Sequence, residues 1–256
     1  MHGSQSLPPP RAAPPLIDLR THAVFLDLDG TLLEIADDPA AVQADTALAD
    51  MLCDLGRACG GALALITGRT IQDADRVLHG AVHNIAGVHG LEVRRDGAIE
   101  RDACAAARLA AALSDVHDLA RHQLLPARVE VKGGSVALHY RHAPEHAQAV
   151  HALAAQIAVS HGLRTLPGKM VIEIVAGAQT KGDAVACFMN RPPFAGRTPV
   201  AVGDDVTDAD AFAAAARLGG FAVRVGDTPV AAAYRLASPS EVRAWLAALL
   251  RKAGVQ

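Results

Sequence analysis

Short apolar runs recur through this chain, and each of them ends at a polar or glycine-containing turn. Four such runs cover residues 23–26, 62–66, 199–202 and 220–225. Because each run is apolar on both faces, it is typical of a strand in a parallel sheet that helices cover on both sides. The segments between the runs place apolar residues at helical spacing, in residues 41–58, 71–78, 181–189, 208–218 and 241–250. This alternation predicts an α/β fold with a doubly wound parallel sheet, a Rossmann-like core.

The middle of the chain follows a different pattern. Residues 103–123 and 147–161 have helical spacing, whereas residues 128–140 and 163–175 alternate between apolar and polar side chains, as antiparallel strands do. An α+β segment inserted between the strands of a parallel sheet indicates a separate cap domain, which we place at residues 97–176.

The remaining residues divide around this insertion. We expect the catalytic core to combine residues 23–96 with residues 177–256. The proline-rich residues 1–22 predict a disordered lead-in.

Composition argues against several classes of function. The 256 residues are 51% hydrophobic, which is enough for a large buried core, and the net charge is −3. The lack of a basic excess argues against nucleic-acid binding, which depends on Lys and Arg at the phosphates. No apolar run approaches the ~20 residues of a membrane helix, and residues 1–15 lack the apolar stretch of a signal peptide. We therefore expect a cytoplasmic protein that binds neither nucleic acid nor membrane.

Acidic or hydroxyl-bearing residues follow three of the apolar runs. They are Asp27, Asp29, Thr67, Asp204, Asp205 and Asp208. In open parallel sheets, ligands bind beyond the carboxyl ends of the strands, so these side chains should meet at one place. Carboxylates that lie so close repel one another unless a cation or shared protons separate them. Oxygen ligands of this kind suit Mg²⁺, which also binds phosphate oxygens, so the cluster predicts Mg²⁺ together with a phosphorylated substrate.

The first acidic pair has the spacing that phosphoryl transfer needs. Asp27 and Asp29 are two residues apart on extended chain, so both carboxylates can face one phosphoryl group. One of them can attack phosphorus, and the other can protonate the leaving oxygen and later activate water. Thr67 offers a hydroxyl group to the phosphoryl oxygens. Lys181, at the start of a helical segment, can offset their charge.

These residues, in this order, resemble the motifs of the haloacid dehalogenase superfamily. The resemblance extends from about residue 24 to residue 250. The matching stretches are Asp27-Leu28-Asp29-Gly30-Thr31, Leu65-Ile66-Thr67-Gly68-Arg69, Lys181, and Gly203-Asp204-Asp205-Val206-Thr207-Asp208. An insertion between the second and third motifs is where the sugar-phosphatase branch of this superfamily carries its cap.

Within that branch, stretches of the inserted segment resemble the trehalose-6-phosphate phosphatase family. They are Val129-Glu130-Val131-Lys132, His139-Tyr140-Arg141 and Gly168-Lys169-Met170-Val171-Ile172-Glu173. A further matching stretch, Gly87 to Glu92, lies in the core. The first and last superfamily motifs indicate the chemistry alone, whereas the cap stretches indicate the substrate.

The resemblance implies a role for each matching residue. Asp27 is expected to be the nucleophile that forms an aspartyl-phosphate, with Asp29 as general acid and base. Thr67 and Lys181 are expected to hold the phosphoryl group. The resemblance further implies a Mg²⁺ ion on the Asp27 carboxylate, the backbone carbonyl of Asp29, and Asp204.

Two other sets of residues follow from the same resemblance. Asp205 and Asp208 are expected to act behind the metal ligands or through water. The candidates for substrate binding are Arg69, His89, Glu130, Lys132, Lys169 and Glu173. Charged side chains suit a disaccharide, because their hydrogen bonds to hydroxyl groups are worth about 1.5–3 kcal/mol each. The alternative for Glu130 and Lys132 is a charged sheet face turned to solvent.

The implied activity is the Mg²⁺-dependent hydrolysis of trehalose 6-phosphate to trehalose and phosphate, the last step of trehalose biosynthesis. A separate trehalose-6-phosphate synthase would then be the pathway partner. The alternatives are another sugar phosphatase, acting on sucrose phosphate or a hexose phosphate, and a catalytically silent sugar-phosphate sensor. A protein-binding or nucleic-acid-binding module is a third, against which the acidic strand ends argue.

Overall fold

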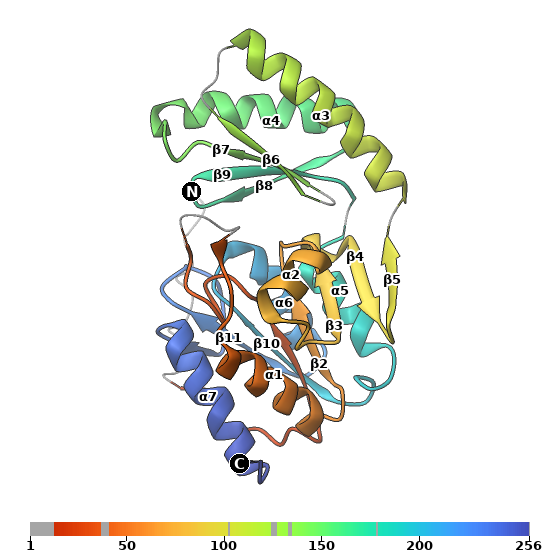
Figure 1. The fold of residues 1–256 in the computed structure, drawn as a ribbon, viewed down its shortest axis with the longest axis vertical. Helices are drawn as coiled ribbons and strands as arrows, with labels where there is room; N and C mark the ends of the chain where they lie inside the picture. Colours follow the sequence, from red (N-terminus) through yellow and green to blue (C-terminus); the bar gives the residue numbers. More distant parts are fainter. Residues whose placement is uncertain are drawn as a thin grey trace, which may run out of the picture.

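The computed structural model describes residues 13–36, 41–101, 103–123, 127–132, 135–177 and 179–255. For residues 101, 103–106, 119, 120, 123 and 132 only the backbone is described. The strands form one eight-stranded sheet and one four-stranded sheet. Figure 1 shows the smaller sheet, with its two helices, stacked over one end of the larger part of the molecule.

The larger sheet has the strand order β12-β11-β10-β1-β2-β3-β4-β5. The six strands from β12 to β3 are parallel, whereas β4 and β5 extend the sheet in antiparallel fashion. Their bounds are β1 His22–Leu26, β2 Leu63–Ile66, β3 Asn84–Gly87, β4 Glu92–Arg95, β5 Ala98–Arg101, β10 Thr198–Gly203, β11 Phe221–Val225 and β12 Tyr234–Leu236. The predicted α/β fold with a doubly wound sheet is thereby confirmed.

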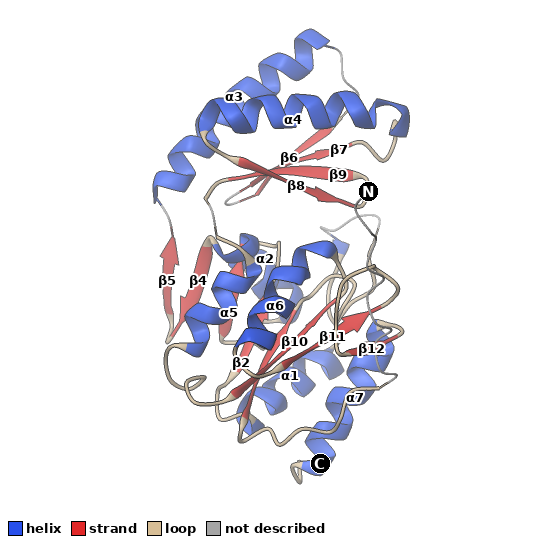
Figure 2. Ribbon diagram, turned by 180° about the vertical axis from the view of Figure 1, so that it is seen from behind, coloured by secondary structure: helices blue, strands red, loops and turns tan. Residues whose placement is uncertain are grey.

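Helices cover both faces of this sheet. The views in Figures 1 and 2 place α1 and α7 on one face and α5 and α6 on the other. The bounds of the helices are α1 Thr46–Ala58, α2 Ile71–Leu78, α5 Lys181–Met189, α6 Ala209–Arg217 and α7 Pro239–Lys252. Between the helix layers, β1 and β2 are buried almost throughout, as their uninterrupted apolar sequences predicted.

Side-chain caps set where several helices begin. Asp45 accepts a hydrogen bond from the Leu48 amide, so α1 starts five residues later than the expected residue 41. Thr180 and Asp183 form a reciprocal capping box that fixes Lys181 as the first residue of α5. The expected helices at 71–78 and 181–189 are confirmed at both ends.

The smaller sheet is antiparallel, in the order β6-β7-β9-β8. Its elements are α3 Ala103–Gln123, β6 Arg128–Lys132, β7 Ser135–His139, α4 Ala147–His161, β8 Arg164–Gly168 and β9 Val171–Val175. One face packs against α3 and α4 and buries the apolar residues Val136, Leu138, Ile172 and Ile174. The alternation in the sequence predicted these antiparallel strands. The helical spacing predicted both helices at their observed bounds.

Four strands of the larger sheet were not predicted. Three of them, β3, β4 and β5, follow one another along the chain, and the fourth is β12. The turn between β4 and β5 is Asp96-Gly97, where both residues have positive φ. An Asp-Gly pair is a strong hairpin signal, so this hairpin was recoverable from the sequence. The chain passes between the two sheets after Arg101 and after Val175, and the domain division at residues 97 and 176 stays a prediction.

The described part of the expected lead-in is packed onto the core. Residues 1–12 lie outside the described residues. Ile17 and Leu19 are buried in the main hydrophobic core. The indole N–H of Trp245 donates to the Pro15 carbonyl at 3.2 Å, and Lys252 donates to the Leu16 carbonyl at 2.7 Å. These contacts attach the segment before β1 to helix α7.

No helix in the described part of the chain is both long enough and apolar enough to cross a membrane.

Two helical glycines give a matched test of the packing. A Cβ atom on Gly182 in α5 would lie 2.5 Å from the backbone carbonyl oxygen of Asp210 in α6, so this helix crossing requires glycine. We expect Gly182→Ala to lower the free energy of unfolding by about 1–3 kcal/mol. The control, Gly56→Ala in α1, meets only a Leu63 methyl group at 3.8 Å. It should raise stability by up to about 1 kcal/mol, because alanine favours helix. Denaturant unfolding checks both values, and equal effects would contradict the assigned crossing.

Candidate active site

The strand order brings together three of the strand ends that carry expected site residues. β10, β1 and β2 are neighbours in the sheet, and Leu26 at the end of β1 pairs with Val202 and Leu65. Asp27, Thr67 and Asp204 each follow directly after one of these strands. The three side chains therefore start from the same edge of the sheet, as the sequence predicted.

An acidic group lies at this edge, in which Asp27 and Asp208 are buried and Asp204 is half-buried. Carboxylate oxygens of Asp27, Asp204 and Asp208 all lie within 4.8 Å of one another. The ammonium group of Lys181 donates to Asp27 Oδ1 at 2.9 Å and to Asp208 Oδ1 at 2.7 Å. Lys181 is only 3% exposed, and these two bonds use two of the three N–H donors of its ammonium group. Three carboxylates facing one ammonium leave an excess of negative charge, which fits a bound cation.

The electrostatics of the group reflect that excess. Burial raises the pKa of Asp27 well above its usual value; Lys181 lowers it, and Asp208 and Asp204 raise it further. Burial and the neighbouring Asp208 raise the pKa of Asp204 to about 6. Burial alone would lower the pKa of Lys181, but Asp208 and Asp27 raise it above its usual value, so the ammonium stays charged.

Asp208 organises the loop that carries Asp204. Its Oδ2 atom accepts hydrogen bonds from the backbone amides of Asp204 and Asp205, both at 3.0 Å. Asp205 caps the short 3-10 turn Val206–Asp208 with its own carboxylate. A Cβ atom on Gly203 would lie 2.3 Å from the Asp208 carboxyl carbon, so only glycine allows this approach. Asp205 lies in the same loop but is not a member of the acidic group of Asp27, Asp204 and Asp208.

Two residues of the first motif hold Asp204 in place. Gly30 has φ of 79°, and a Cβ atom there would lie 2.1 Å from Asp204 Oδ2. The Thr31 hydroxyl group, which is completely buried, donates to Asp204 Oδ1 at 3.2 Å. Sequence reasoning did not assign Thr31 to the site, although its place directly after Asp27-Leu28-Asp29-Gly30 was a signal.

Asp29 is paired separately, with Arg69. The Arg69 guanidinium donates from Nε to Asp29 Oδ2 and from Nη2 to Asp29 Oδ1, both at 2.7 Å. A third bond, from Nη1 to Asp73 Oδ2, measures 2.6 Å. The buried Thr67 hydroxyl oxygen accepts the Arg69 backbone amide at 3.1 Å. Asp73 was not among the expected site residues, because nothing in its helical position distinguishes it from an ordinary surface carboxylate.

The face of the smaller sheet opposite α3 and α4 carries charged side chains toward the larger sheet. Glu130 pairs with Ala137, and Ala137 pairs with Glu173, so both glutamates are on this face. Glu173 Oε2 lies 3.5 Å from Nε2 of His89, which belongs to the larger part of the molecule. Glu130 Oε2 lies 2.8 Å from Nε2 of His139, a partner that the sequence did not predict.

Two further expected substrate residues lie on the same sheet. Lys132 ends β6, paired in register with Ser135, and its side chain lies outside the described part of the structure. Lys169 lies in the turn between β8 and β9 and is exposed. The expected set therefore comes together in part, with His89 and Glu173 in direct proximity.

His89 occupies a strained turn after β3. Val88 and His89 have φ of 48° and 57°, a left-handed conformation that a β-branched residue such as Val rarely adopts. The Val88 amide donates to the Arg69 carbonyl at 2.9 Å, and the His89 amide donates to the Thr67 carbonyl at 3.0 Å. Backbone strain of this kind persists only where surrounding contacts enforce it, and it is frequent at functional sites.

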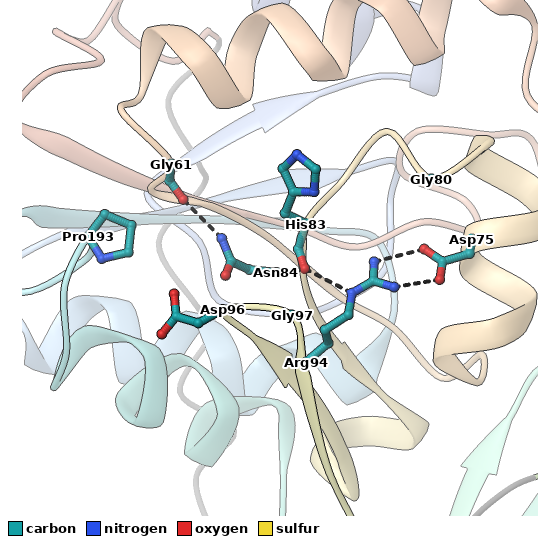
Figure 3. A pocket seen from close by; sticks show the side chains of 9 residues that line it. All are labelled: Gly61, Asp75, Gly80, His83, Asn84, Arg94, Asp96, Gly97 and Pro193. Carbon is teal, nitrogen blue, oxygen red and sulfur yellow. Dashed lines mark hydrogen bonds and ion pairs between the residues drawn. The ribbon is translucent and has the colours of Figure 1, made fainter.

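A pocket at the other end of the larger sheet contains none of the expected site residues. Figure 3 shows it near the start of β3, between Asn84, Arg94 and Pro193. Its main polar side chains form hydrogen bonds to other groups of the protein. Asn84 donates to the Gly61 carbonyl at 3.0 Å, and Arg94 forms two bonds to Asp75 at 2.5 and 2.8 Å. We therefore assign Asn84 and Arg94 a role in stabilising the fold.

Comparison with known proteins identifies the family. A family model described as trehalose-phosphatase matches residues 25–240. The probable trehalose-phosphate phosphatase of Sinorhizobium fredii is 42% identical over 237 residues, which cover 86% of this chain and 83% of the relative. The trehalose-6-phosphate phosphatase of Escherichia coli is 39% identical over 237 residues, covering 88% of this chain and 85% of the relative.

Solved structures show the same fold. The C-terminal domain of trehalose-6-phosphate phosphatase from C. albicans superimposes with a TM-score of 0.77 at 21% identity, covering 93% of each chain. A haloacid dehalogenase-like hydrolase from Bacteroides thetaiotaomicron gives a TM-score of 0.65 at 15% identity, covering 91% of this chain and 99% of the other. With the family match over most of its length, the chain belongs to the trehalose-phosphatase family and is a phosphoric monoester hydrolase with a haloacid dehalogenase fold.

Proposed function

We propose that this protein hydrolyses trehalose 6-phosphate to trehalose and phosphate through an aspartyl-phosphate on Asp27. The observation that carries the proposal is the acidic group of Asp27, Asp204 and Asp208 at the ends of adjacent strands, with the buried Lys181 bonded to Asp27 and Asp208. The charged face of the smaller sheet lies above it. Such a site combines a nucleophile, a cationic partner for phosphate and polar groups for sugar hydroxyls.

The acidic group fits a divalent cation, for which Mg²⁺ is our assignment. Asp27, Asp204 and the backbone carbonyl of Asp29 would hold the ion, with Asp205 and Asp208 behind them. The donors are all oxygen atoms, which is the preference of Mg²⁺ in phosphate chemistry. When bound, the ion would neutralise charge on the phosphoryl oxygens and orient the group for attack.

The residues of the chain would then carry out two steps. In the first, an Asp27 carboxylate oxygen bonds to phosphorus while the bond from phosphorus to the sugar 6-oxygen breaks, and Asp29 gives that oxygen a proton. In the second, Asp29 takes a proton from water as the water oxygen attacks phosphorus, so that phosphate leaves and Asp27 is restored. Thr67 and Lys181 would hold the phosphoryl oxygens during both steps.

The smaller sheet would select the sugar. Glu130, Lys132, Lys169 and Glu173 would contact the hydroxyl groups of trehalose, with His89 completing the set from the core. Two observations support this role: Glu130 and Glu173 share the face turned to the core, and Glu173 reaches His89. In this proposal residues 97–176 act as the cap domain, and the enzyme completes cytoplasmic trehalose biosynthesis after a separate synthase.

Removal of the cation should destabilise the fold in a pH-dependent way. The pKa of Asp204 is about 6 in the folded protein, above its usual value of 3.8, so folded protein without Mg²⁺ should lose stability as pH rises through 6. At a Mg²⁺ concentration 100-fold above Kd, binding should add about 2.7 kcal/mol and raise Tm by roughly 5–10 °C at pH 7.5.

Thermal melts with Mg²⁺ or EDTA at pH 5 and 7.5 measure this effect. Asp204→Asn should abolish most of the Mg²⁺ shift, whereas Asp50→Asn, an exposed change in α1, should keep it. If Mg²⁺ raised the Tm of Asp204→Asn as much as that of the wild type, the ion would have to bind at another site.

Replacement of the nucleophile tests the mechanism. We expect Asp27→Asn to fold and yet release phosphate at least about 10³-fold more slowly, because the amide cannot form the phosphoryl ester bond. Phosphate release, followed with a colorimetric assay alongside circular dichroism, measures both properties. Turnover close to that of the wild type would rule out Asp27 as the nucleophile.

A panel of phosphate esters tests the substrate. Wild-type protein with Mg²⁺ should prefer trehalose 6-phosphate to sucrose phosphate, hexose phosphates and p-nitrophenyl phosphate. Glu130→Ala should lower kcat/KM for trehalose 6-phosphate by about 10–100-fold, the cost of roughly one charged hydrogen bond, and spare p-nitrophenyl phosphate.

The matched control is Val131→Thr, the next residue of β6, which lies on the opposite face and is 57% exposed. It should retain the wild-type preference. A preference for another sugar phosphate would assign the enzyme to that substrate instead, and no release from any ester would favour a sensor.

A further inference from the structure

Arg69 carries a buried charge whose main partners are two carboxylates from different elements. Its exposed fraction is 8%. Two of its nitrogen atoms bind the two oxygens of Asp29, both at 2.7 Å, and the third binds Asp73 in the first turn of α2 at 2.6 Å. Asp29 itself is partly open, with 37% of its side chain exposed. The buried Arg69 thus holds the Asp29 carboxylate in place, although the packing around Asp29 leaves it partly exposed.

The geometry of this pair restricts Asp29 strongly. Two parallel bonds between a guanidinium and a carboxylate set both the position and the plane of the carboxylate. Each carboxylate oxygen keeps a further lone pair, so either oxygen can exchange a proton while Arg69 still holds both. Asp73 holds the guanidinium from the opposite side, which prevents the pair from moving together.

The backbone of Arg69 is fixed as well. Its amide donates to the Thr67 hydroxyl oxygen at 3.1 Å, and its carbonyl accepts the Val88 amide at 2.9 Å. The neighbouring Gly68 packs tightly against His89, because a Cβ atom on Gly68 would lie 3.0 Å from the His89 ring. One turn therefore holds Thr67 toward the phosphoryl position and holds Asp29 through the Arg69 side chain.

We propose that Arg69 is a positioning residue, which holds the Asp29 carboxylate in register with the leaving oxygen, rather than a ligand of the sugar. The inference rests on the proposed function, in which Asp29 transfers the proton. It predicts a specific dependence on the leaving group. A sugar alkoxide needs the proton from Asp29 when it departs, whereas p-nitrophenolate departs without one.

The experiment compares single-turnover formation of the aspartyl-phosphate from the two esters. Arg69→Ala should slow this step by about 10²-fold with trehalose 6-phosphate, the usual effect of a misplacement near 1 Å, and by less than threefold with p-nitrophenyl phosphate. In steady state kcat should fall while KM for trehalose 6-phosphate changes little. Added guanidinium ion should restore part of the rate, and Arg69→Lys should not, since an ammonium cannot make the paired bonds.

The matched control is Arg94→Ala. Arg94 also makes two bonds to a carboxylate of α2, Asp75, but at the far end of the sheet (Figure 3). Arg94→Ala should be less stable than the wild type, but its rates with trehalose 6-phosphate and p-nitrophenyl phosphate should keep the wild-type ratio. A rise in KM alone for Arg69→Ala, or equal losses with both esters, would overturn the positioning role and make Arg69 a substrate ligand or a structural residue.

A second variant keeps the proposal testable if Arg69→Ala does not fold. Asp73→Asn leaves Arg69 and Asp29 in place and removes only the anchor on α2. It should slow the trehalose 6-phosphate step by about 10-fold, since the pair is less tightly held, and unchanged kinetics would overturn the proposal. Failure of the proposed function would appear differently, as wild-type protein that does not hydrolyse trehalose 6-phosphate.

Discussion

The ammonium group of Lys181 is the interaction on which the rest of the site depends. It joins Asp27, 154 residues earlier in the chain, to Asp208, 27 residues later, with all three side chains buried. Removing one partner of such a buried pair typically costs about 3–5 kcal/mol, because it leaves a charge uncompensated. Yet one ammonium cannot balance three carboxylates. The folded protein therefore maintains a concentrated negative charge at the end of its sheet, and the raised pKa values of Asp27 and Asp204 are its signature.

The close packing of this charge depends on residues that have no side chain. Gly30 and Gly203 lie directly against the carboxylates of Asp204 and Asp208, at positions where a Cβ atom would approach within 2.4 Å. Each of the two acidic motifs therefore contributes carboxylates and also a glycine that leaves room for a carboxylate. Gly30 leaves room for Asp204 of the other motif, and Gly203 leaves room for Asp208 of its own motif. This explains why glycine stands beside the aspartates in both stretches, in physical terms that do not depend on turn preference alone.

Much of this arrangement was predictable because strand ends in a parallel sheet converge. Asp27, Thr67 and Asp204 each follow an apolar run, and the helical spacing of residues 181–189 placed Lys181 at a helix start. The bond between Arg69 and Asp29 was not predictable in the same way. It depends on the direction of a long side chain after a turn, which spacing does not determine. Strand β3 was missed because four residues with glycine at the end carry little periodic signal, and β5 because its alternation is brief.

The connection between the two sheets has a physical basis of its own. Val88 and Leu91, from the segment after β3, are buried in the hydrophobic cluster of the smaller sheet. The backbone of the same segment is hydrogen-bonded to Thr67 and Arg69 in the turn after β2. Left-handed backbone at Val88 and His89 costs about 1–3 kcal/mol for each residue, and burial of the Val88 side chain, worth about 1.5–3 kcal/mol, offsets part of this cost.

This strained segment consequently ties the two parts of the molecule together. The Val88 side chain packs in the hydrophobic cluster of the smaller sheet, and the Val88 amide donates a hydrogen bond to the Arg69 carbonyl. The His89 side chain lies next to the carboxylate of Glu173 in the smaller sheet. A shift of the smaller sheet would pull on both the side-chain packing and the hydrogen bonds of this one turn. In the proposed function, sugar contacts on the smaller sheet and phosphoryl contacts on the larger one would therefore not be independent, since a single segment of four residues, Val88 to Leu91, takes part in the packing of both.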